Sequence, residues 1–382
     1  MDLSRKYRIA MLPGDGIGRE VISEVRRVLD EVIIWIDGLE LEIHEFDCGG
    51  ECFLRTGREW SEEAEKFTKT EADAVLFGGI GVIGPDGKTV RRPDGNLAGY
   101  SVVIGLRHDL DLYANVRPVK LFEGVPTPLV SKGPKDIDMV IVRENTEGLY
   151  YPARGRIKES NRDFAYDLRL ITTHGSERIA RYAFDLAMTR NGAPVDGDKR
   201  VTCVDKSNLL AGCQLFRETF TRVGDEYKDI SKDYAYVDAW TLLAIRKPEY
   251  YDVVVAPNEF GDIISDLGAA LQGGLGVAPS GNIGDRHAVF EPVHGSAPDI
   301  AGTGKANPIA AVLSMAMMFE WLGKKHGDAV SARAAEKIRN SVKLVLQEGR
   351  VRTPDLCVGE WSSIVPSTTQ QVTDEIIRKM KR

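Results

Sequence analysis

Short runs of β-branched residues alternate along this chain with segments of helical period, and this alternation constrains the fold more than any other feature. Residues 17–29 carry apolar side chains at helical spacing, and Asn307-Pro308 is expected to open a strongly apolar helix with Asn307 as its N-cap. Strands that alternate with helices favour an α/β fold. The strands that we expect are residues 7–12, 72–77, 138–142, 201–204 and 252–256.

The length of the chain suits two domains rather than one. Compact domains usually contain roughly 100–200 residues, and this chain has 382. No Pro/Ser-rich linker marks a boundary between domains. Two domains that share one continuous sheet, or one domain inserted in the other, would explain why none is visible.

Composition excludes several classes of protein. With 50 Lys and Arg against 57 Asp and Glu, the net charge is −7, and we expect no nucleic-acid partner. The 5 cysteines are scattered, as is typical of free thiols in a reducing cytoplasm. The N-terminus lacks the pattern of a signal peptide, and the most apolar segment, residues 309–322, is shorter than the ~18 residues of a membrane span. We expect a soluble, cytoplasmic protein with no membrane partner.

Three glycine-rich segments suggest nucleotide binding, but each has another interpretation. Residues 79–84 match GxGxxG, yet the turn residues 85–87 follow where a Rossmann fold needs a helix N-terminus. Residues 87–89 end like a P-loop, but Val82 stands where its first glycine belongs. Residues 14–18 lie between an expected strand and an expected helix, where glycines serve a tight turn with or without a ligand.

Two acidic residues are spaced for one face of a helix. Asp262 and Asp266 stand four apart in an apolar segment, and the nearest basic residues in the sequence are Lys247 and Arg286. A solvated helix face is the ordinary interpretation. With no basic residue nearby in the sequence, we expect the two carboxylates to be unpaired, and unpaired acids would instead suggest a site for Mg²⁺ or Mn²⁺, which prefer oxygen ligands. Both interpretations remain open on this pattern alone. Asp238 is a further acid within an apolar stretch.

Several basic residues come directly after apolar runs. Lys206 follows an expected strand, where a lysine is usually a surface residue but can act as a base near a metal. Arg107, Arg117 and Arg143 each follow an apolar run, and each alone suits a structural role. Together they are able to clamp a dicarboxylate, because a planar guanidinium pairs with carboxylates through two hydrogen bonds.

Taken in order, five segments resemble the isocitrate/isopropylmalate dehydrogenase family over nearly the whole chain. They are LPGDGIG, LRHDLDLYANVRPVK, VIVRENTEGLYY, NEFGDIISDLGA and FEPVHGSAPDIAGTGKANP. The resemblance implies an α/β, isopropylmalate dehydrogenase-like two-domain fold with a shared large mixed sheet flanked by helices, and not a Rossmann fold. It implies a large cofactor-binding domain of residues 1–112 and 273–382. Residues 113–272 would form a smaller inserted domain with the metal ligands and the dimer interface.

The same resemblance assigns roles to individual residues. Substrate carboxylates would bind Arg107, Arg117 and Arg143. Tyr150 matches the proton-donating tyrosine of the family, and Lys206 matches its catalytic lysine. The ligands of Mg²⁺ or Mn²⁺ would be Asp238, Asp262 and Asp266. Because Lys206 and Asp238 reach the partner subunit's site in the family, a homodimer, or a tetramer built from it, with shared active sites is implied.

The resemblance also places the cofactor, whose adenosine would lie in the loop of residues 294–307. Asp299 would accept hydrogen bonds from the ribose hydroxyls and repel the extra phosphate of NADP, so the expected cofactor is NAD. The residues expected to bind it are His294, Gly295, Ser296, Ala297, Asp299, Ile300 and Asn307.

In the family that the chain resembles, the residues just before the first arginine contact the third group of the substrate, and here these residues precede Arg107. Val103 and Ile104 offer an apolar wall that suits an isopropyl group and leaves a third carboxylate unpaired. Ser101 matches a serine of isocitrate enzymes, but Val103 replaces their asparagine, and the extra arginine of homoisocitrate enzymes is missing near Ile104. Isopropylmalate enzymes often have Leu-Leu and an upstream Glu, where this chain has Val-Ile and Tyr100. We expect conversion of 3-isopropylmalate to 4-methyl-2-oxopentanoate in leucine biosynthesis, with isocitrate, homoisocitrate, D-malate and tartrate as alternatives.

Overall fold

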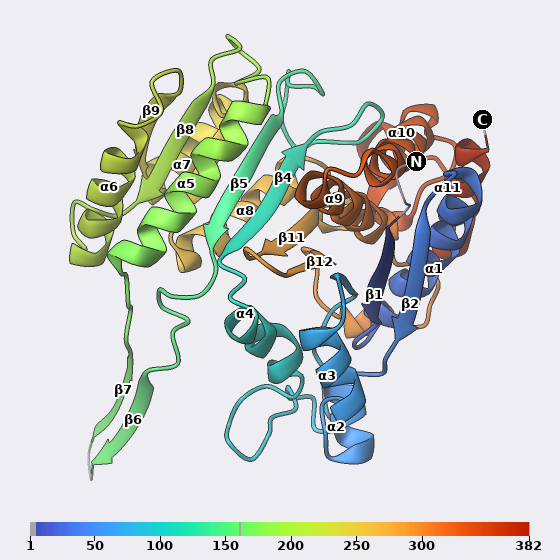
Figure 1. Ribbon diagram of the computed structural model, residues 1–382, viewed down its shortest axis with the longest axis horizontal. Coiled ribbons are helices and arrows are strands. Elements are labelled where there is room, and N and C mark those ends of the chain that lie inside the picture. The colour runs from blue at the N-terminus through green and yellow to red at the C-terminus, as the bar shows by residue number, and fades with distance from the viewer. Residues whose placement is uncertain (1–4, 160–161, 382) are drawn as a thin grey trace. The chain divides into compact units, whose positions relative to one another are not determined.

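The computed structural model describes residues 5–159 and 162–381, and the chain forms two compact units. Unit 1 comprises Met1–Asp111, Leu121–Pro128 and Gln272–Arg382. Unit 2 comprises Leu112–Lys120 and Leu129–Leu271. The α/β fold expected from the sequence is confirmed: the large mixed sheet has ten strands, five in each unit (Figure 1).

The five strands of unit 1 are mostly parallel. Their order is β2-β1-β3-β12-β11, and only the pairing of β11 with β12 is antiparallel. The buried runs of β1 and β3 are apolar on both faces, as expected of strands covered on both sides. The strands are β1 (Lys6–Leu12), β2 (Glu40–Glu45), β3 (Ala74–Phe77), β11 (Pro279–Ile283) and β12 (Ala288–Pro292).

The helices of unit 1 pack around one buried helix, α9 (Ile309–His326), which contacts β11 and β12. It is apolar on nearly all sides because α10 covers the side away from the strands. α11 contacts both α10 and α1. The remaining helices are α1 (Ile17–Trp35), α2 (Gly50–Thr56), α3 (Glu62–Thr70), the π-helix η1 (Ser101–Gly105), α4 (Leu106–Asp109), η3 (Leu275–Val277), η4 (Pro298–Ile300), α10 (Ala329–Glu348), η5 (Pro354–Leu356), η6 (Gly359–Trp361) and α11 (Thr369–Met380).

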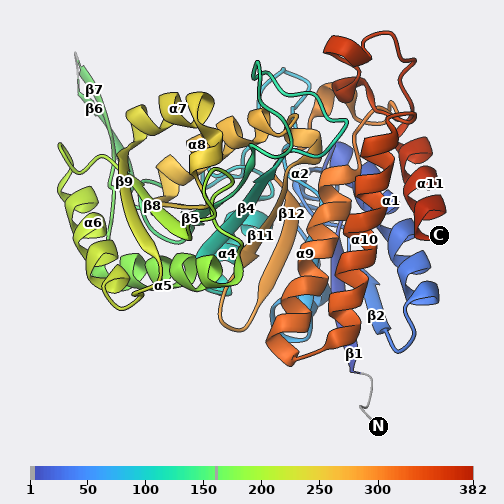
Figure 2. The same cartoon turned by 90° about the horizontal axis from the view of Figure 1, so that it is seen from above.

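Unit 2 has the same layered construction. Its strand order is β4-β5-β10-β8-β9, in which only β4 and β5 are antiparallel. Helices α5 and α6 cover one face of these strands, and α7 and α8 cover the other (Figure 2). The elements are β4 (Ala114–Lys120), β5 (Asp138–Glu144), α5 (Thr173–Thr189), β8 (Arg200–Asp205), α6 (Ala211–Gly224), β9 (Ser231–Tyr236), α7 (Val237–Arg246), η2 (Pro248–Tyr250), β10 (Val253–Ala256) and α8 (Asn258–Leu271).

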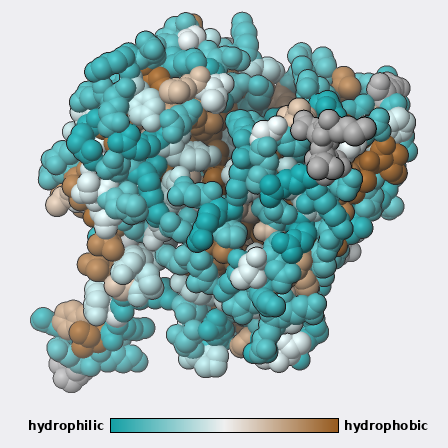
Figure 3. Space-filling model, viewed as in Figure 1, coloured by the Kyte–Doolittle hydropathy of each residue, from teal (hydrophilic) through white to brown (hydrophobic). Residues whose placement is uncertain are grey.

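A two-stranded hairpin of β6 (Arg154–Glu159) and β7 (Arg162–Asp167) projects from the rest of unit 2 (Figure 1). Its side chains are largely exposed, and hydrophobic residues stand out on it (Figure 3). Ile157, Phe164 and Tyr166 are 52%, 44% and 57% exposed. An isolated hairpin is marginally stable in water, and exposed apolar side chains of this kind mark surfaces that bind another protein surface.

The five strands expected from the sequence are present as β1, β3, β5, β8 and β10, and the helix expected from residue 17 is α1. One expected boundary was wrong. α9 begins at Ile309, so its N-cap is Pro308 and not Asn307. Asn307 still performs the capping bond, since its Oδ1 accepts from the Ile309 N–H at 3.0 Å. The backbone of Pro308 has already turned into the helical region, which shifts the boundary by one residue.

The division predicted from the sequence differs from the two units at Leu112 and Gln272, which each fall in the other unit, and at one longer segment. Leu121–Pro128, which the sequence placed with the inserted domain, belongs to unit 1. A Cβ on Gly124 would meet the Leu346 carbonyl oxygen at 2.2 Å, and Gly273 lies against the Val125 side chain. This close packing on unit 1 residues fixes the segment there.

In the described part of the chain, no helix combines the length and the apolar character needed to cross a membrane. All 5 cysteines are free, as expected, and only Cys357 is not buried.

Candidate active site

One face of α8 carries the polar residues of the candidate site in unit 2. Asn258, Asp262, Ser265 and Asp266 follow one another at spacings that a helix places on one side. Gly261 lies against Arg143, where a Cβ would meet the arginine side chain at 2.7 Å. The absence of a side chain at position 261 therefore lets the arginine pass close along the helix.

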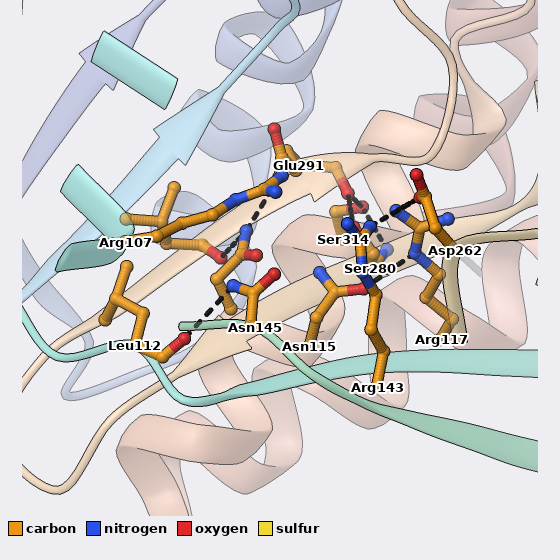
Figure 4. A network of polar contacts seen from close by, with 12 residues as sticks. Arg107, Leu112, Asn115, Arg117, Arg143, Asn145, Asp262, Ser280, Glu291 and Ser314 are labelled. Atoms are coloured by element: carbon orange, nitrogen blue, oxygen red, sulfur yellow. Dashed lines mark hydrogen bonds and ion pairs between the residues drawn. The ribbon is translucent and has the colours of Figure 1, made fainter. Parts of the chain in front are cut away.

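Two arginines meet at Asp262 (Figure 4). Arg143, from β5, is almost completely buried and donates to Asp262 Oδ1 through Nη1 and to Asn258 Oδ1 through Nε at 3.0 Å. Arg117, from β4, donates to Ser265 Oγ at 2.7 Å, and its Nη2 lies 3.4 Å from Asp262 Oδ1. Because the two arginines come from neighbouring antiparallel strands, the sheet brings both guanidinium groups to the same carboxylate.

The expectation that Asp262 and Asp266 are unpaired was wrong. Arg117 Nη1 lies 3.5 Å from Asp266 Oδ1, and both arginines reach Asp262. The counter-charges come from distant strands, so the search for basic residues near the acids in the sequence could not find them. Burial and the neighbouring Asp262 raise the pKa of Asp266, although the Arg117 guanidinium opposes the shift.

Tyr150 joins the same cluster from the turn after β5. Its hydroxyl donates to Asp262 Oδ2 at 3.2 Å, and the Arg143 guanidinium lies over its ring at 5.6 Å. Burial and then the Asp262 charge raise the pKa of Tyr150. The phenol is thus held protonated while its ring remains 46% exposed, which leaves it accessible to a ligand.

Lys206 and Asp238 form a separate pair. Lys206 follows β8, Asp238 lies in the first turn of α7, and the ammonium donates to the Asp238 carboxylate. This bond is the largest cause of the lowered pKa of Asp238. Among the residues that the structure describes, neither partner shares a hydrogen bond or an ion pair with Asp262, Asp266 or Tyr150.

The three acids expected to bind a metal are therefore not gathered by one chain. Within residues 5–159 and 162–381, no group of three or more His, Cys, Asp or Glu side chains is placed to hold a metal ion. Asp262 and Asp266 alone provide two neighbouring carboxylates, the ligand type that Mg²⁺ and Mn²⁺ prefer. The donor chemistry fits such a cation, and the third acid would have to come from elsewhere.

The first arginine lies in unit 1. Arg107, on α4, approaches Glu291 Oε1 of β12 at 3.5 Å, and its Nε is buried without a hydrogen-bond partner among the described residues (Figure 4). A buried N–H without a partner is costly unless a ligand accepts from it. Val103 and Ile104 lie in η1, one turn before Arg107, and both are partly exposed.

The expected cofactor loop packs against two of the glycine-rich segments. The Ile17 N–H donates to the Ser296 carbonyl oxygen at 2.8 Å, and a Cβ on Gly16 would meet that oxygen at 2.1 Å. A Cβ on Gly81 would meet Ser296 Oγ at 2.8 Å. As expected, a turn and not a helix follows residues 79–84, where the Gly87 N–H donates to Gly84. These glycines act by permitting close backbone approach.

The side chains of this loop offer groups that fit a nucleotide. His294 Nδ1 lies 3.0 Å from the Gly295 carbonyl, so a neutral ring donates there and keeps Nε2 as an acceptor. That Nε2 is buried with no partner in the described chain, and burial lowers the pKa of His294. Asp299 and Ile300 are exposed on η4, and Ala297 adopts a left-handed φ of 36° just before it.

Sequence reasoning missed the residues that hold the arginines. Asn115 accepts from Arg117 Nε at 2.7 Å, Asn258 and Ser265 fix the other guanidinium nitrogens, and Glu291 approaches Arg107. Asn258 and Ser265 had a detectable signal, because they share the helical stripe of Asp262 and Asp266. Glu291 is an acid in an otherwise apolar strand, which was also visible in the sequence.

The chain is similar to known dehydrogenases over nearly its whole length. The family model for isocitrate/isopropylmalate dehydrogenase matches residues 8–376. A 3-isopropylmalate/3-methylmalate dehydrogenase from Methanocaldococcus jannaschii is 42% identical over 351 residues, which cover 92% of this chain and 94% of that protein. A homoisocitrate dehydrogenase from the same organism is 41% identical over 384 residues, covering 98% of each. The crystal structure of an isocitrate dehydrogenase from Methylococcus capsulatus aligns with a TM-score of 0.83 at 34% identity, covering 98% of this chain and 100% of that one.

Proposed function

The chain belongs to the isocitrate/isopropylmalate dehydrogenase family and is a β-decarboxylating dehydrogenase, and from this membership we propose that its substrate is 3-isopropylmalate. The product would be 4-methyl-2-oxopentanoate, with a role in leucine biosynthesis. The similar proteins carry names that specify 3-isopropylmalate, 3-methylmalate, homoisocitrate and isocitrate, so the family alone does not select among them.

The observation that carries the choice of substrate is the pair Val103 and Ile104. Both are partly exposed on η1, the helical turn that leads to Arg107. A third substrate carboxylate beside them would lose its hydration without gaining a hydrogen bond, which costs several kcal/mol, roughly 2–7 for an unpaired polar group. An isopropyl group would gain by burial there.

We propose NAD and Mg²⁺ or Mn²⁺ as the cofactors. Asp299 supports NAD, because a carboxylate there would accept from ribose hydroxyls and repel a 2′-phosphate. Asp262 and Asp266 would hold the cation, with Asp238 contributed by a second subunit. When bound, the cation would supply Lewis acidity at the α-hydroxyl and NAD would supply the hydride acceptor.

The residues of the chain then bind the substrate and move protons. Arg107, Arg117 and Arg143 would hold the substrate carboxylates through paired N–H groups. Lys206 of a second subunit would remove the hydroxyl proton. After loss of the β-carboxylate as CO₂, Tyr150 would protonate the carbon that carried it. The hydrogen bond of its hydroxyl to Asp262 fits this role, because it fixes the position of the phenol.

We further propose that the protein is a homodimer whose subunits share active sites. In the described chain, the pair of Lys206 and Asp238 shares no hydrogen bond or ion pair with Asp262, which supports completion of each site by a partner. α7, which carries Asp238, also exposes large apolar side chains: Leu242 is 52% exposed and Ile245 is 45% exposed. Together with the projecting hairpin, they offer surface that a second copy would bury.

The experiment that tests the function is NADH formation with Mn²⁺ on 3-isopropylmalate, isocitrate, homoisocitrate, D-malate and tartrate. We expect kcat/KM for 3-isopropylmalate to exceed the others by at least about tenfold, which corresponds to about 1.4 kcal/mol of discrimination. A preference for a tricarboxylate would contradict the apolar-wall argument and leave the family unaffected. A non-catalytic scaffold would give no NADH with any of them.

A further inference from the structure

Glu59 is a buried carboxylate outside the site described above. It is 5% exposed and lies immediately before Trp60 and the N-terminus of α3 in unit 1. The Gly49 N–H donates to its carbonyl oxygen at 2.8 Å, and Cys48 pairs with Trp60 in an antiparallel bridge. This pairing with residues 48 and 49 fixes the backbone of Glu59, and with it the region that its side chain can reach.

The side chain reaches the beginning of η1, the turn that carries Val103 and Ile104. Glu59 Oε1 accepts from the Gly99 N–H at 2.7 Å, and Oε2 accepts from the Ser101 N–H at 2.9 Å. The Ser101 hydroxyl also donates to Oε2. Gly99 has a φ of 97°, and a Cβ there would meet Ile80 at 2.4 Å, so the turn that presents these two amides requires glycine.

The hydroxyl of Ser101 has a single proton, and Glu59 accepts it. An ionised carboxylate only accepts hydrogen bonds, so the direction of this bond is fixed. Ser101 then has only lone pairs to offer to a ligand. A substrate carboxylate also has only lone pairs, so it cannot form a hydrogen bond with this hydroxyl. An apolar substituent needs no hydrogen bond from Ser101.

We propose that Glu59 is a positioning residue that determines specificity: by taking the Ser101 proton, it prevents this turn from binding a third substrate carboxylate. This proposal rests on the proposed function and deepens it, because it explains how a chain with a serine at position 101 would still select an apolar 3-substituent. Glu59 acts through Ser101 and does not itself contact the substrate.

Charge repulsion is not the cause of this selectivity. Arg92 Nη1 lies 3.1 Å from Glu59 Oε2, so a guanidinium already compensates the carboxylate. Arg92 Nη2 in turn lies 3.0 Å from Asp94. Both ends of the guanidinium are thus engaged, and Arg92 is not free to bind a substrate carboxylate in place of Ser101.

The test measures kcat/KM for 3-isopropylmalate, isocitrate and homoisocitrate in Glu59→Gln, Ser101→Ala and the double variant. Glu59→Gln exchanges a charged acceptor for a neutral one, and hydrogen bonds to charged acceptors are about twice as strong. The Ser101 proton then favours a substrate carboxylate, and we expect the ratio of tricarboxylate to 3-isopropylmalate turnover to rise about tenfold. Ser101→Ala alone should change the ratio by less than about threefold, and the double variant should lose the gain.

Glu63→Gln, an exposed acid on the adjacent helix, is the matched control and should leave the ratio unchanged. Circular dichroism and Tm identify variants that fail to fold. A folded Glu59→Gln with an unchanged ratio would overturn the proposal. So would a tenfold loss of tricarboxylate turnover in Ser101→Ala, because it would mean that the Ser101 proton reaches the substrate.

Failure of the proposed function is recognised separately. If the unmodified protein prefers isocitrate, the function is wrong, while Ser101→Ala still tests where the proton goes. If no substrate turns over, calorimetric binding of isocitrate and 3-isopropylmalate with Mn²⁺ gives the same ratios without catalysis. Unchanged ratios in folded Glu59→Gln would again overturn the proposal.

Discussion

Asp262 contacts most of the other side chains of the candidate site in unit 2. Its Oδ1 receives both arginines, and its Oδ2 receives the Tyr150 hydroxyl. A carboxylate with two oxygens accepts several hydrogen bonds at once, so one side chain fixes the positions of three others. Substitution of Tyr150, the exposed partner, should therefore alter the chemistry of the site more than the stability of the fold.

Tyr150→Phe tests whether the Tyr150 hydroxyl takes part in the reaction. The ring is 46% exposed, so loss of the hydroxyl should change stability by less than about 0.5 kcal/mol. Loss of a proton donor should lower kcat about a hundredfold or more. Steady-state kinetics and thermal unfolding provide the two measurements. Tyr151→Phe, which removes a hydroxyl from the adjacent residue, is the control. A full kcat in Tyr150→Phe would exclude proton donation by this residue.

At the scale of elements, capping residues connect strands and helices within unit 1. Asp328 caps α10 by accepting from Val330 N–H at 2.8 Å, and it also accepts from the Tyr7 hydroxyl of β1 at 3.1 Å. Burial, and then this hydrogen bond, raise the pKa of Tyr7 to about 12. One carboxylate thus caps the N-terminus of α10 and also binds a side chain of the buried strand β1.

The raised pKa of Tyr7 has a consequence for stability at high pH. The neutral phenol stabilises the fold fully below about pH 10, the value of an unfolded tyrosine. As the pH rises from there through the folded pKa of about 12, the unfolded state loses the proton first and stability falls. Tyr7→Phe should cost about 1 kcal/mol at neutral pH and weaken this alkaline loss.

Denaturant unfolding of both proteins between pH 8 and about pH 11 measures the effect. Tyr166→Phe, on the exposed hairpin, is the control and should behave like the unmodified protein. If the free energy of unfolding fell with pH in the same way in Tyr7→Phe and in the unmodified protein, the alkaline loss of stability would not come from Tyr7.

The glycine turn between β1 and α1 contacts the expected cofactor loop, and a substitution at Gly16 tests whether this contact matters for NAD binding. Gly16→Ala would place a Cβ 2.1 Å from the Ser296 carbonyl oxygen and displace the expected cofactor loop. Because small displacements of a binding group are costly, we expect KM for NAD to rise about tenfold or more. Gly57→Ala, at a similar positive φ with no atom within 4 Å, adds only backbone strain of about 1 kcal/mol. Equal KM values for NAD in the two variants would mean that the contact between Gly16 and Ser296 does not affect NAD binding.

At the scale of the whole molecule, the three acids that we propose as metal ligands form two separate groups in the described chain. Asp262 and Asp266 lie on α8, whereas Asp238 pairs with Lys206 at the start of α7. A closed dimer with two-fold symmetry would complete both sites at once, because each subunit gives and receives the same residues.

Mixing two inactive variants tests this arrangement. Asp238→Asn and Asp262→Asn should each abolish turnover, because every site in either homodimer lacks one acid. Co-expressed, they form mixed dimers in which one site has both acids intact, and about a quarter of full activity should return. Activity with Mn²⁺ in the co-expressed sample is the measurement. No recovery in verified mixed dimers would mean that one chain builds the whole site.

The sequence by itself determined the local features of this protein. Period and turn residues gave the order of strands and helices, and the four-residue spacing of Asp262 and Asp266 placed them on one helix face, because local geometry follows from neighbours in the chain. Only the tertiary structure decided which distant groups meet: that Arg117 and Arg143 neutralise those acids, and that Glu59 takes the Ser101 proton. Such pairs depend on strand order and on burial, and neither leaves a periodic signal in the sequence.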